Sequence, residues 1–291
     1  MRHASPTRER QPTMFPTQSA HLLLALALAA TGVAQAGTIR VLQANLFSWS
    51  TMDPAKQPPP IVKLSQYVNQ HRHDFVTTQE NEYRLLDSRY QLSADYKLAG
   101  ELQDASIFYD STRWEPAAAP WARIAVSPDG GGERLAVFSQ FRNKASGEAV
   151  VIATTHLCIA WGGHADCTGG QYAAHVADTQ HIGRYLNAYA PAGVPLIVTG
   201  DFNNFERHPE QSAAIEQAFA AYGLAAVKAG KEFIGPTFEK STIDFVYTRQ
   251  LTVQSASLYD AAAGNPSDHA AIDVTLVSDG GAGPKSPGAA R

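Results

Sequence analysis

Short apolar segments that end in a polar residue recur along this chain. The clearest is residues 196–203 (LIVTGDFN), where a β-branched run predicts a buried strand and is followed at once by Asp201 and Asn203. If the backbone stays extended here, these two side chains lie on the same face, because they are two residues apart. A strand that presents a carboxylate and an amide at its end is a rigid support for a functional site.

Alternation and helical spacing of apolar residues predict the other elements. Strands are expected at residues 38–45, 74–79, 96–98, 105–109, 135–141, 149–155, 243–248, 252–259 and 271–277, and helices at residues 61–71, 172–189 and 209–222. Residues 127–132 (SPDGGG) are expected to form an exposed turn. Many strands with interspersed helices predict a mixed α/β fold, in which two sheets pack face to face with helices outside.

Polar residues suited to metal binding or acid–base chemistry stand at the ends of these strands. They are Asn45, Glu80, His156, Asp201, Asn203, Asp268 and His269, and Asp244 lies just inside a further strand. Singly, most have an ordinary explanation, such as a turn cap, a helix start or a core histidine. Asp244 is harder to explain in this way, because a carboxylate inside an apolar strand needs a partner.

As a set, these residues indicate phosphate ester chemistry. Oxygen ligands without a Cys/His cluster favour Mg²⁺ or Mn²⁺ over zinc. Two histidines with a carboxylate partner suit general acid–base catalysis. A hard divalent ion beside histidines is the arrangement that phosphate ester cleavage requires.

The first residues carry the pattern of an export signal. Three arginines precede a short apolar run at residues 22–30, and Ala34-Gln35-Ala36 matches the small-residue motif of signal peptidase cleavage. We therefore expect residues 1–36 to be a signal peptide, cleaved near Ala36/Gly37, and the protein to be secreted or periplasmic. A disordered leader and a retained anchor are the alternatives. The apolar run is too short for a spanning helix, so we expect no transmembrane segment.

Residues 37–277 are then expected to form one domain, and residues 278–291 a flexible tail. The two cysteines, Cys158 and Cys167, enclose a loop that contains two glycines. In an exported protein this spacing predicts a disulfide that braces the loop. Two separate buried thiols, or a zinc pair that includes His164, are the alternatives.

Six motifs together resemble the endonuclease/exonuclease/phosphatase superfamily, whose members share the DNase I-like fold. The motifs, in the order in which that family has them, are Gln43-Ala44-Asn45, Thr78-Gln79-Glu80, Thr155-His156-Leu157, Gly200-Asp201-Phe202-Asn203, Ile243-Asp244-Phe245-Val246 and Ser267-Asp268-His269. The resemblance covers nearly the whole expected domain. It implies a four-layered α/β sandwich, with two mostly antiparallel sheets packed face to face and helices outside.

The resemblance also implies which residues hold the metal. Glu80 resembles the main ligand, with Asn45 beside it and Asp268 assisting. Mg²⁺ is the expected ion, with Mn²⁺ as the alternative.

Catalytic roles follow from the same resemblance. Asp244 and His269 resemble the pair that handles the proton of the attacking water, with Asp201 as the alternative base. Asn203 resembles the residue that orients the phosphate or the Asp201 carboxylate. His156 resembles the histidine that stabilises the phosphoryl oxygens or protonates the leaving oxygen.

The expected reaction is phosphodiester hydrolysis by a monomer, and three substrate classes remain open. A nuclease usually has a basic face, whereas this chain has a formal net charge of −4 and no Lys/Arg cluster. A sphingomyelinase-like phospholipase would need an exposed aromatic segment, for which Phe47-Ser48-Trp49 and Trp161 are candidates. A small soluble phosphate ester is the third class. A binding module without catalysis would be expected to lack some motif residues, and none is missing.

Three residues are candidates for substrate contacts. Arg134 enters the strand before His156 and is a candidate phosphate contact, with a solvated strand-end arginine as the alternative. Trp161 and His164 lie in the loop after His156, where they would touch substrate or pack on the surface.

Overall fold

The computed structural model describes residues 37–47, 59–81, 90–100, 104–117, 121–129, 132–159, 167, 171–204 and 209–278. Contacts divide the chain after Val33, and every described residue belongs to the second unit. The expected signal peptide, the tail from residue 279 onward, and Trp49, Trp161 and His164 lie outside the described residues. No helix in the described part is long and apolar enough to cross a membrane.

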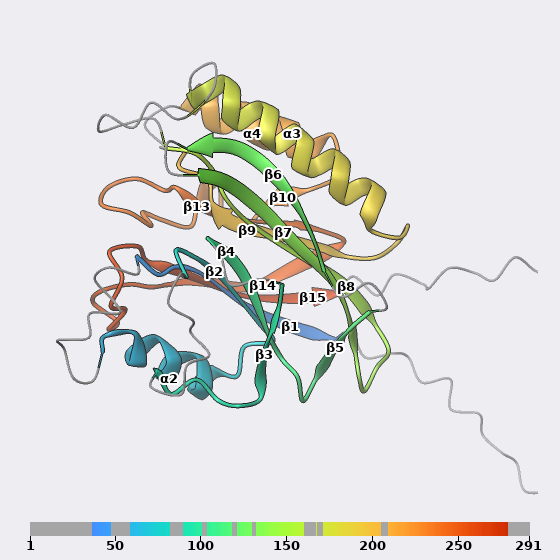
Figure 1. Cartoon of the computed structure of the whole chain (residues 1–291), viewed down its shortest axis with the longest axis vertical. Coiled ribbons are helices and arrows are strands. Elements are labelled where there is room, and N and C mark those ends of the chain that lie inside the picture. Colours follow the sequence, from blue (N-terminus) through green and yellow to red (C-terminus); the bar gives the residue numbers. More distant parts are fainter. Residues whose placement is uncertain are drawn as a thin grey trace, which may run out of the picture. The chain divides into compact units, whose positions relative to one another are not determined.

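Two large sheets form the centre of the fold (Figure 1). The first has the order β14-β15-β1-β2-β4-β3, with β1 at Thr38–Asn45, β2 at Phe75–Gln79, β3 at Tyr96–Ala99, β4 at Ala105–Asp110, β14 at Leu251–Tyr259 and β15 at Ala271–Ser278. Only β1 and β2 are parallel neighbours in it; its other pairs are antiparallel.

The second sheet has the order β10-β13-β9-β8-β7-β5, and β6 also pairs with β7. Its strands are β5 at Trp114–Pro116, β6 at Ala122–Asp129, β7 at Gly132–Asn143, β8 at Ala149–His156, β9 at Leu196–Asp201, β10 at Ala225–Ala226 and β13 at Asp244–Arg249. Here β8 and β9 are the parallel pair, and the other pairs are antiparallel. A separate two-stranded ribbon joins β11 at Lys228–Ala229 to β12 at Glu232–Phe233.

Alternation along the strands explains the layers. In β1, Ile39 and Val41 belong to the core between the sheets, whereas Leu42 packs against the helix α2 (Ile61–His71). In β8, Ile152 lies in the same central core, whereas Val151 packs against α3 (Gln171–Tyr189) and α4 (Pro209–Ala220). The order of layers is therefore helix, sheet, sheet, helices, and the predicted four-layered α/β class is confirmed.

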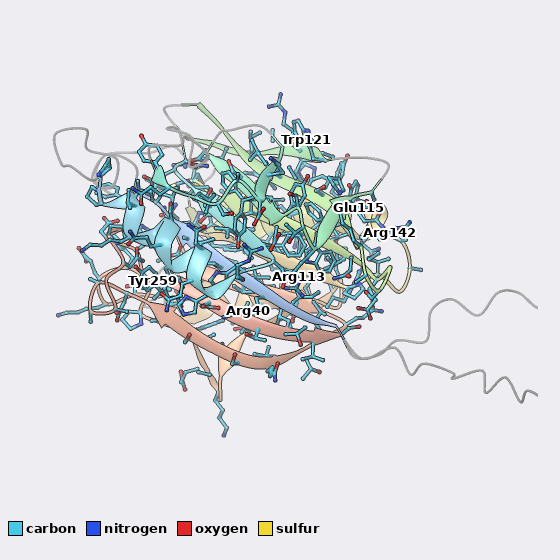
Figure 2. All side chains as sticks on the ribbon, turned by 90° about the horizontal axis from the view of Figure 1, so that it is seen from below. Arg40, Arg113, Glu115, Trp121, Arg142 and Tyr259 are labelled. Atoms are coloured by element: carbon cyan, nitrogen blue, oxygen red, sulfur yellow. A yellow bond between two sulfur atoms is a disulfide. The ribbon has the colours of Figure 1, made fainter. Side chains whose placement is uncertain are left out.

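One tyrosine of the helix α2 makes both an aromatic and a polar contact with the sheet. The ring of Tyr67 stacks on the ring of Tyr259 in β14, labelled in Figure 2, with a centroid separation of 3.9 Å. Its hydroxyl donates a hydrogen bond of 2.7 Å to Asp273 of β15. The helix, which packs on the sheet through its apolar face, thus gains a polar contact with β15, the strand next to the edge strand β14.

Several boundaries differ from the sequence prediction. The predicted exposed turn at 127–132 is wrong in extent, because β6 continues to Asp129 and β7 begins at Gly132. A register shift between Ala125 and Pro128 accommodates the proline, which edge strands tolerate. Strands β5, β6, β10, β11 and β12 were not predicted, since β6 contains the proline and the other four have two or three residues each.

Candidate active site

Strand direction gathers the polar residues at one end of the sandwich. Across the second sheet, His156 pairs with Asp201, and Asp201 pairs with Asp244. These three side chains therefore lie side by side on neighbouring strands. In the first sheet, the parallel strands β1 and β2 end together at Asn45 and Gln79, so that Glu80, the next residue, lies at the same end.

The inward-facing positions become polar toward this end. In β9 they run from Ile197 through Thr199 to Asp201, and β1 changes from Val41 to Gln43. The threonine hydroxyl of Thr199 donates to Thr77 of the opposite sheet at 2.8 Å. A buried polar layer of this kind is tolerated because its members hydrogen-bond to one another.

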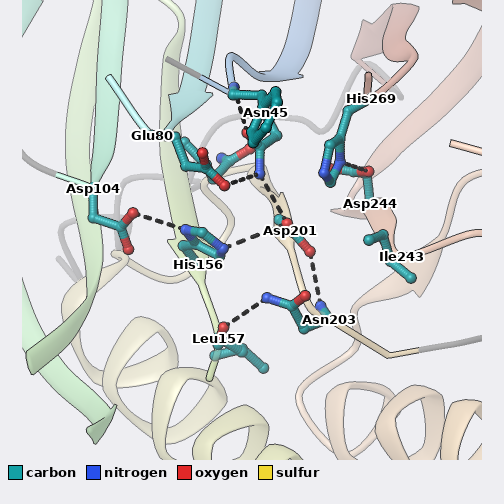
Figure 3. Close-up of polar contacts among 12 residues, drawn as sticks. Asn45, Glu80, Asp104, His156, Leu157, Asp201, Asn203, Ile243, Asp244 and His269 are labelled. Atoms are coloured by element: carbon teal, nitrogen blue, oxygen red, sulfur yellow. Dashed lines mark hydrogen bonds and ion pairs between the residues drawn. The ribbon is translucent and has the colours of Figure 1, made fainter. Parts of the chain in front are cut away.

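Asp201 is the centre of the site (Figure 3). Its Oδ2 lies 2.9 Å from the amide nitrogen of Asn45 and 3.4 Å from Nε2 of His156, and its Oδ1 accepts the backbone N–H of Asn203 at 2.8 Å. The side chain is buried. Burial and the nearby charge of Asp244 raise the pKa of Asp201, while the positive charges of the two histidines act in the opposite direction.

His156 is held between two carboxylates. Its Nδ1 lies 2.8 Å from Oδ1 of Asp104, and its Nε2 faces Asp201. The guanidinium of Arg134 bonds the other Asp104 oxygen at 2.7 Å and lies 2.5 Å from the same Nδ1. Burial lowers the pKa of His156, as does Arg134, but Asp104 and Asp201 outweigh them and leave it above the ordinary value.

Sequence reasoning missed Asp104. It lies in none of the six motifs and does not end a predicted strand; it immediately precedes β4. Because β4 runs antiparallel to β2, its start lies beside the end of β2, and Glu80 N–H donates to the Asp104 carbonyl at 2.9 Å. An acidic residue directly before an apolar strand was the signal available.

His269 forms the second histidine–carboxylate pair. Its Nδ1 donates to Oδ2 of Asp244 at 2.9 Å, and both residues are buried. Burial alone would lower the pKa of His269, but Asp244 and Asp201 raise it to about 10. The Asp244 backbone is fixed in turn, since its N–H donates to the Thr237 hydroxyl at 3.1 Å.

Asn203 was expected to share a face with Asp201 only if the backbone stayed extended, and that condition is not met. The backbone does not stay extended after Asp201, because Asn203 has a φ of 48°. Its N–H bonds the Asp201 side chain in an Asx turn, and its amide nitrogen donates to the Leu157 carbonyl at 2.9 Å. Asn203 therefore ties the ends of β8 and β9 together and holds the Asp201 carboxylate.

Asn45 and Glu80 meet Asp201 from the first sheet. The amide nitrogen of Asn45 lies 3.1 Å from Oε1 of Glu80, and its amide oxygen accepts the N–H of Phe47 at 2.9 Å. In this arrangement Asn45 binds the two carboxylates through its hydrogens, which differs from direct metal ligation through its oxygen. Burial raises the pKa of Glu80.

This donor set fits a hard divalent cation. Two carboxylates, the half-buried Glu80 and the buried Asp201, approach the side-chain amide of Asn45, and the pKa of each is raised. A hard cation bound by these oxygens would neutralise the negative charge of the two carboxylates. Asp268 is exposed. It lies at the same end of the sandwich, because the hydroxyl of the neighbouring Ser267 donates to the Asn45 carbonyl at 2.8 Å.

A second group of potential ligands overlaps the first. Among the described residues, ligand atoms of Asp201, Asp244 and His269 all lie within 4.8 Å of one another. Two of these, Asp244 and His269, already bond each other, so proton handling is the simpler use of that pair.

The remaining predicted residues are placed as follows. Arg134 reaches the site, and the contacts seen for it are to Asp104 and His156. Cys158 and Cys167 form the predicted disulfide, with an S–S distance of 2.05 Å. The zinc alternative does not apply, because the sulfurs are bonded to each other. Trp161 and His164 lie outside the described residues.

Comparison with known proteins agrees with this architecture. Among solved structures, a protein described as an endonuclease/exonuclease/phosphatase family protein from Bacteroides thetaiotaomicron is 19% identical, with a TM-score of 0.64; the match covers 84% of this chain and 99% of that one. The mannosyl-6-phosphatase of Bacteroides thetaiotaomicron is 20% identical, with a TM-score of 0.62, over 82% and 99% of the two chains.

The human Nocturnin catalytic domain with a bound sulfate anion is 21% identical, with a TM-score of 0.62, over 82% of this chain and 94% of that one. A search of curated protein sequences finds no match. At these identities the likeness to solved structures establishes the fold. The sequence model of the Endonuclease/Exonuclease/phosphatase family matches residues 43–269, which is most of the chain. The chain therefore belongs to the endonuclease/exonuclease/phosphatase family, whose members are metal-dependent hydrolases of phosphate esters.

Proposed function

We propose that this protein is an exported, Mg²⁺-dependent phosphodiesterase. The single observation that carries the catalytic part is the register of three neighbouring strands, which sets Asp201 between His156 and Asp244. A central carboxylate flanked by two histidine–carboxylate pairs supplies both a proton acceptor and positive charge for phosphoryl oxygens. The leader-like sequence of residues 1–36 supports export, and the Cys158–Cys167 disulfide is compatible with it.

The metal would be held by Glu80 and Asp268, and by Asn45 once its amide turns from the hydrogen-bonded orientation described above to present its oxygen. There it would neutralise phosphoryl charge and stabilise the leaving oxygen. We assign to Asp201, which lies between the two histidines, the role of general base that accepts the proton of the attacking water. His156 and His269 donate hydrogen bonds to the phosphoryl and leaving oxygens. Asn203 acts by holding the Asp201 carboxylate in place.

Small or single phosphodiesters are the preferred substrates over long nucleic acids. The chain has 23 Lys and Arg residues against 27 Asp and Glu, a balance that provides little attraction for a polyanion. The Bacteroides mannosyl-6-phosphatase supports a monoester as the second candidate, since its phosphate is carried by a small sugar.

A hydrolysis panel tests the proposal. Purified protein is assayed with bis-p-nitrophenyl phosphate, p-nitrophenyl phosphate, sphingomyelin and DNA, each with Mg²⁺ and with EDTA. We expect Mg²⁺-dependent cleavage of the diester, abolished by EDTA. His269→Ala and Asp201→Asn should each lower kcat by about 100-fold or more, with the larger loss for Asp201→Asn if it accepts the proton.

The remaining outcomes separate the alternatives. Faster turnover of the monoester would identify the protein as a phosphatase and not a diesterase. Preferential cleavage of DNA would identify a nuclease, and preferential cleavage of sphingomyelin a phospholipase. No hydrolysis of any of the four by the folded wild-type protein would sink the proposal and leave a binding module.

A further inference from the structure

Gln43 connects the catalytic pair to the opposite sheet. It lies on β1, two residues before Asn45, and its side chain is fully buried between the sheets. Its amide nitrogen donates to Oδ1 of Asp244 at 3.0 Å and to Oε1 of Gln79 at 2.7 Å. Both amide hydrogens are thereby used, one in each sheet.

The donor and acceptor roles of Gln43 and Gln79 are fixed by the Gln79 contact with Thr154. The amide nitrogen of Gln79 donates to the Thr154 hydroxyl at 2.8 Å, so the Gln79 oxygen is the acceptor that faces Gln43. Turning the Gln43 amide over would place its oxygen against two acceptors, the Gln79 oxygen and the Asp244 carboxylate. The orientation of Gln43 is therefore determined by its neighbours.

The two oxygens of Asp244 have separate partners. Oδ1 accepts the Gln43 amide, and Oδ2 accepts Nδ1 of His269. Asp244 is fully buried, and a carboxylate with only one donor would be free to rotate about its χ2 and present either oxygen to the histidine. The Gln43 hydrogen bond prevents that rotation, and it reduces the cost of burying the charge.

Packing alone does not account for glutamine at this position. The Gln43 amide oxygen is buried and has no hydrogen-bond partner among the described residues. An unpaired buried acceptor costs stability, whereas an apolar side chain of similar size would leave no such atom. The donors that Gln43 directs at Asp244 and Gln79 are the gain that offsets this cost.

We propose that Gln43 is a positioning residue, which fixes the Asp244 carboxylate so that His269 is held in its working orientation. This inference rests on the proposed function of the same site. Because Gln43 is fully buried between the sheets, we expect it to make no contact with substrate, and its loss should lower kcat and leave KM little changed. Supporting groups of this kind typically contribute tenfold to hundredfold in activity.

The test compares Gln43→Met, which keeps the size but removes both donors, with Thr77→Val. Thr77 belongs to the same buried polar layer, where its hydroxyl bonds Thr199 and the Leu42 carbonyl and not the Asp244–His269 pair. We expect Gln43→Met to lower kcat about tenfold to hundredfold and Thr77→Val to leave it within about twofold. Both variants should lose stability, because each removes buried hydrogen bonds.

A double-mutant cycle separates positioning from a general structural effect. In an Asp244→Asn background the carboxylate that Gln43 orients is gone, so Gln43→Met should add almost no further loss of kcat. Additive losses would overturn the inference, as would an equal loss of kcat in Thr77→Val. If Gln43→Met does not fold, Gln43→Asn replaces it, since its shorter side chain does not span the distance to Asp244.

A spectroscopic readout is independent of turnover. The His269 Nδ1–H bonded to Asp244 should give a downfield proton resonance, assigned by its loss in His269→Ala. It should move in Gln43→Met and stay in place in Thr77→Val. An unmoved resonance in Gln43→Met overturns the inference, whereas an inactive wild type with the expected shift overturns only the proposed function.

Discussion

Each histidine of the site is defined by the carboxylate behind it. Asp104 bonds Nδ1 of His156, and Asp244 bonds Nδ1 of His269, so in both rings Nε2 is the nitrogen turned toward the centre. The pKa of Asp104 is below its ordinary value, because His156 and Arg134 outweigh the effect of burial. Asp104 in turn raises the pKa of His156, against the effects of burial and of Arg134.

Removing that charge tests the role of Asp104. Asp104→Asn keeps the size and one acceptor oxygen but no longer favours the cationic ring, so we expect kcat to fall about tenfold to hundredfold. Asp95→Asn is the control, since Asp95 pairs with Arg72 on an exposed part of the surface. Steady-state kinetics on the diester measures both variants. A kcat within twofold of wild type in Asp104→Asn would contradict the assignment.

At the scale of elements, the contact between β8 and β9 sets the spacing of the site. The two strands are parallel and bring Thr155 opposite Gly200, one residue before His156 meets Asp201. Gly200 has a φ of +153°, and a Cβ there would lie 2.3 Å from the Thr155 carbonyl oxygen. Only glycine permits this close approach, so the glycine in the GDFN motif has a packing reason.

Gly200→Ala should therefore damage both stability and activity. The added methyl must push a backbone carbonyl away, which we expect to cost about 2–3 kcal/mol in the free energy of unfolding and to displace His156 from Asp201. Gly147→Ala is the matched control: its φ is +77°, but nothing lies within 4 Å of the added Cβ. It should cost about 1 kcal/mol and leave kcat unchanged. Urea unfolding and kinetics distinguish the two, and equal losses in both would refute the packing argument.

At the scale of the whole molecule, a buried histidine links the end of β8 to both covering helices. His175 of α3 donates from Nε2 to the Cys158 carbonyl at 2.8 Å, and its Nδ1 accepts from Gln211 of α4 at 3.1 Å. Both contacts suit the neutral ring. Burial lowers the pKa of His175 to about 4, although the Cys158 carbonyl acts in the opposite direction.

This predicts a loss of stability in mild acid. Unfolded histidine titrates near pH 6.5, so between about pH 6.5 and pH 4 the unfolded chain binds a proton that the folded chain does not. The free energy of unfolding should therefore decrease as the pH is lowered across this window, by up to about 3 kcal/mol from this residue. His175→Gln removes the titration and keeps a hydrogen-bonding side chain. Urea midpoints measured from pH 7 to pH 4 should converge between wild type and variant; parallel curves would contradict the prediction.

Much of the fold was predictable because its signals are local. The β-branched run before Gly200 and the apolar spacing of residues 61–71 identify a strand and a helix whatever surrounds them. Strand β6 was missed because its proline is tolerated only at a sheet edge, and edge position is a property of the assembled sheet.

The sequence by itself determined the family, the order of the motifs and the residue types available to the site. It did not determine which side chains meet. Gln43 and Asp244 are separated by 201 positions and Asp104 and His156 by 52, so only the packing of two sheets and the direction of each strand brought them together. Asn203 leaves the extended conformation, with a φ of 48°, and its hydrogen bonds to Asp201 and Leu157 exist only in the folded chain.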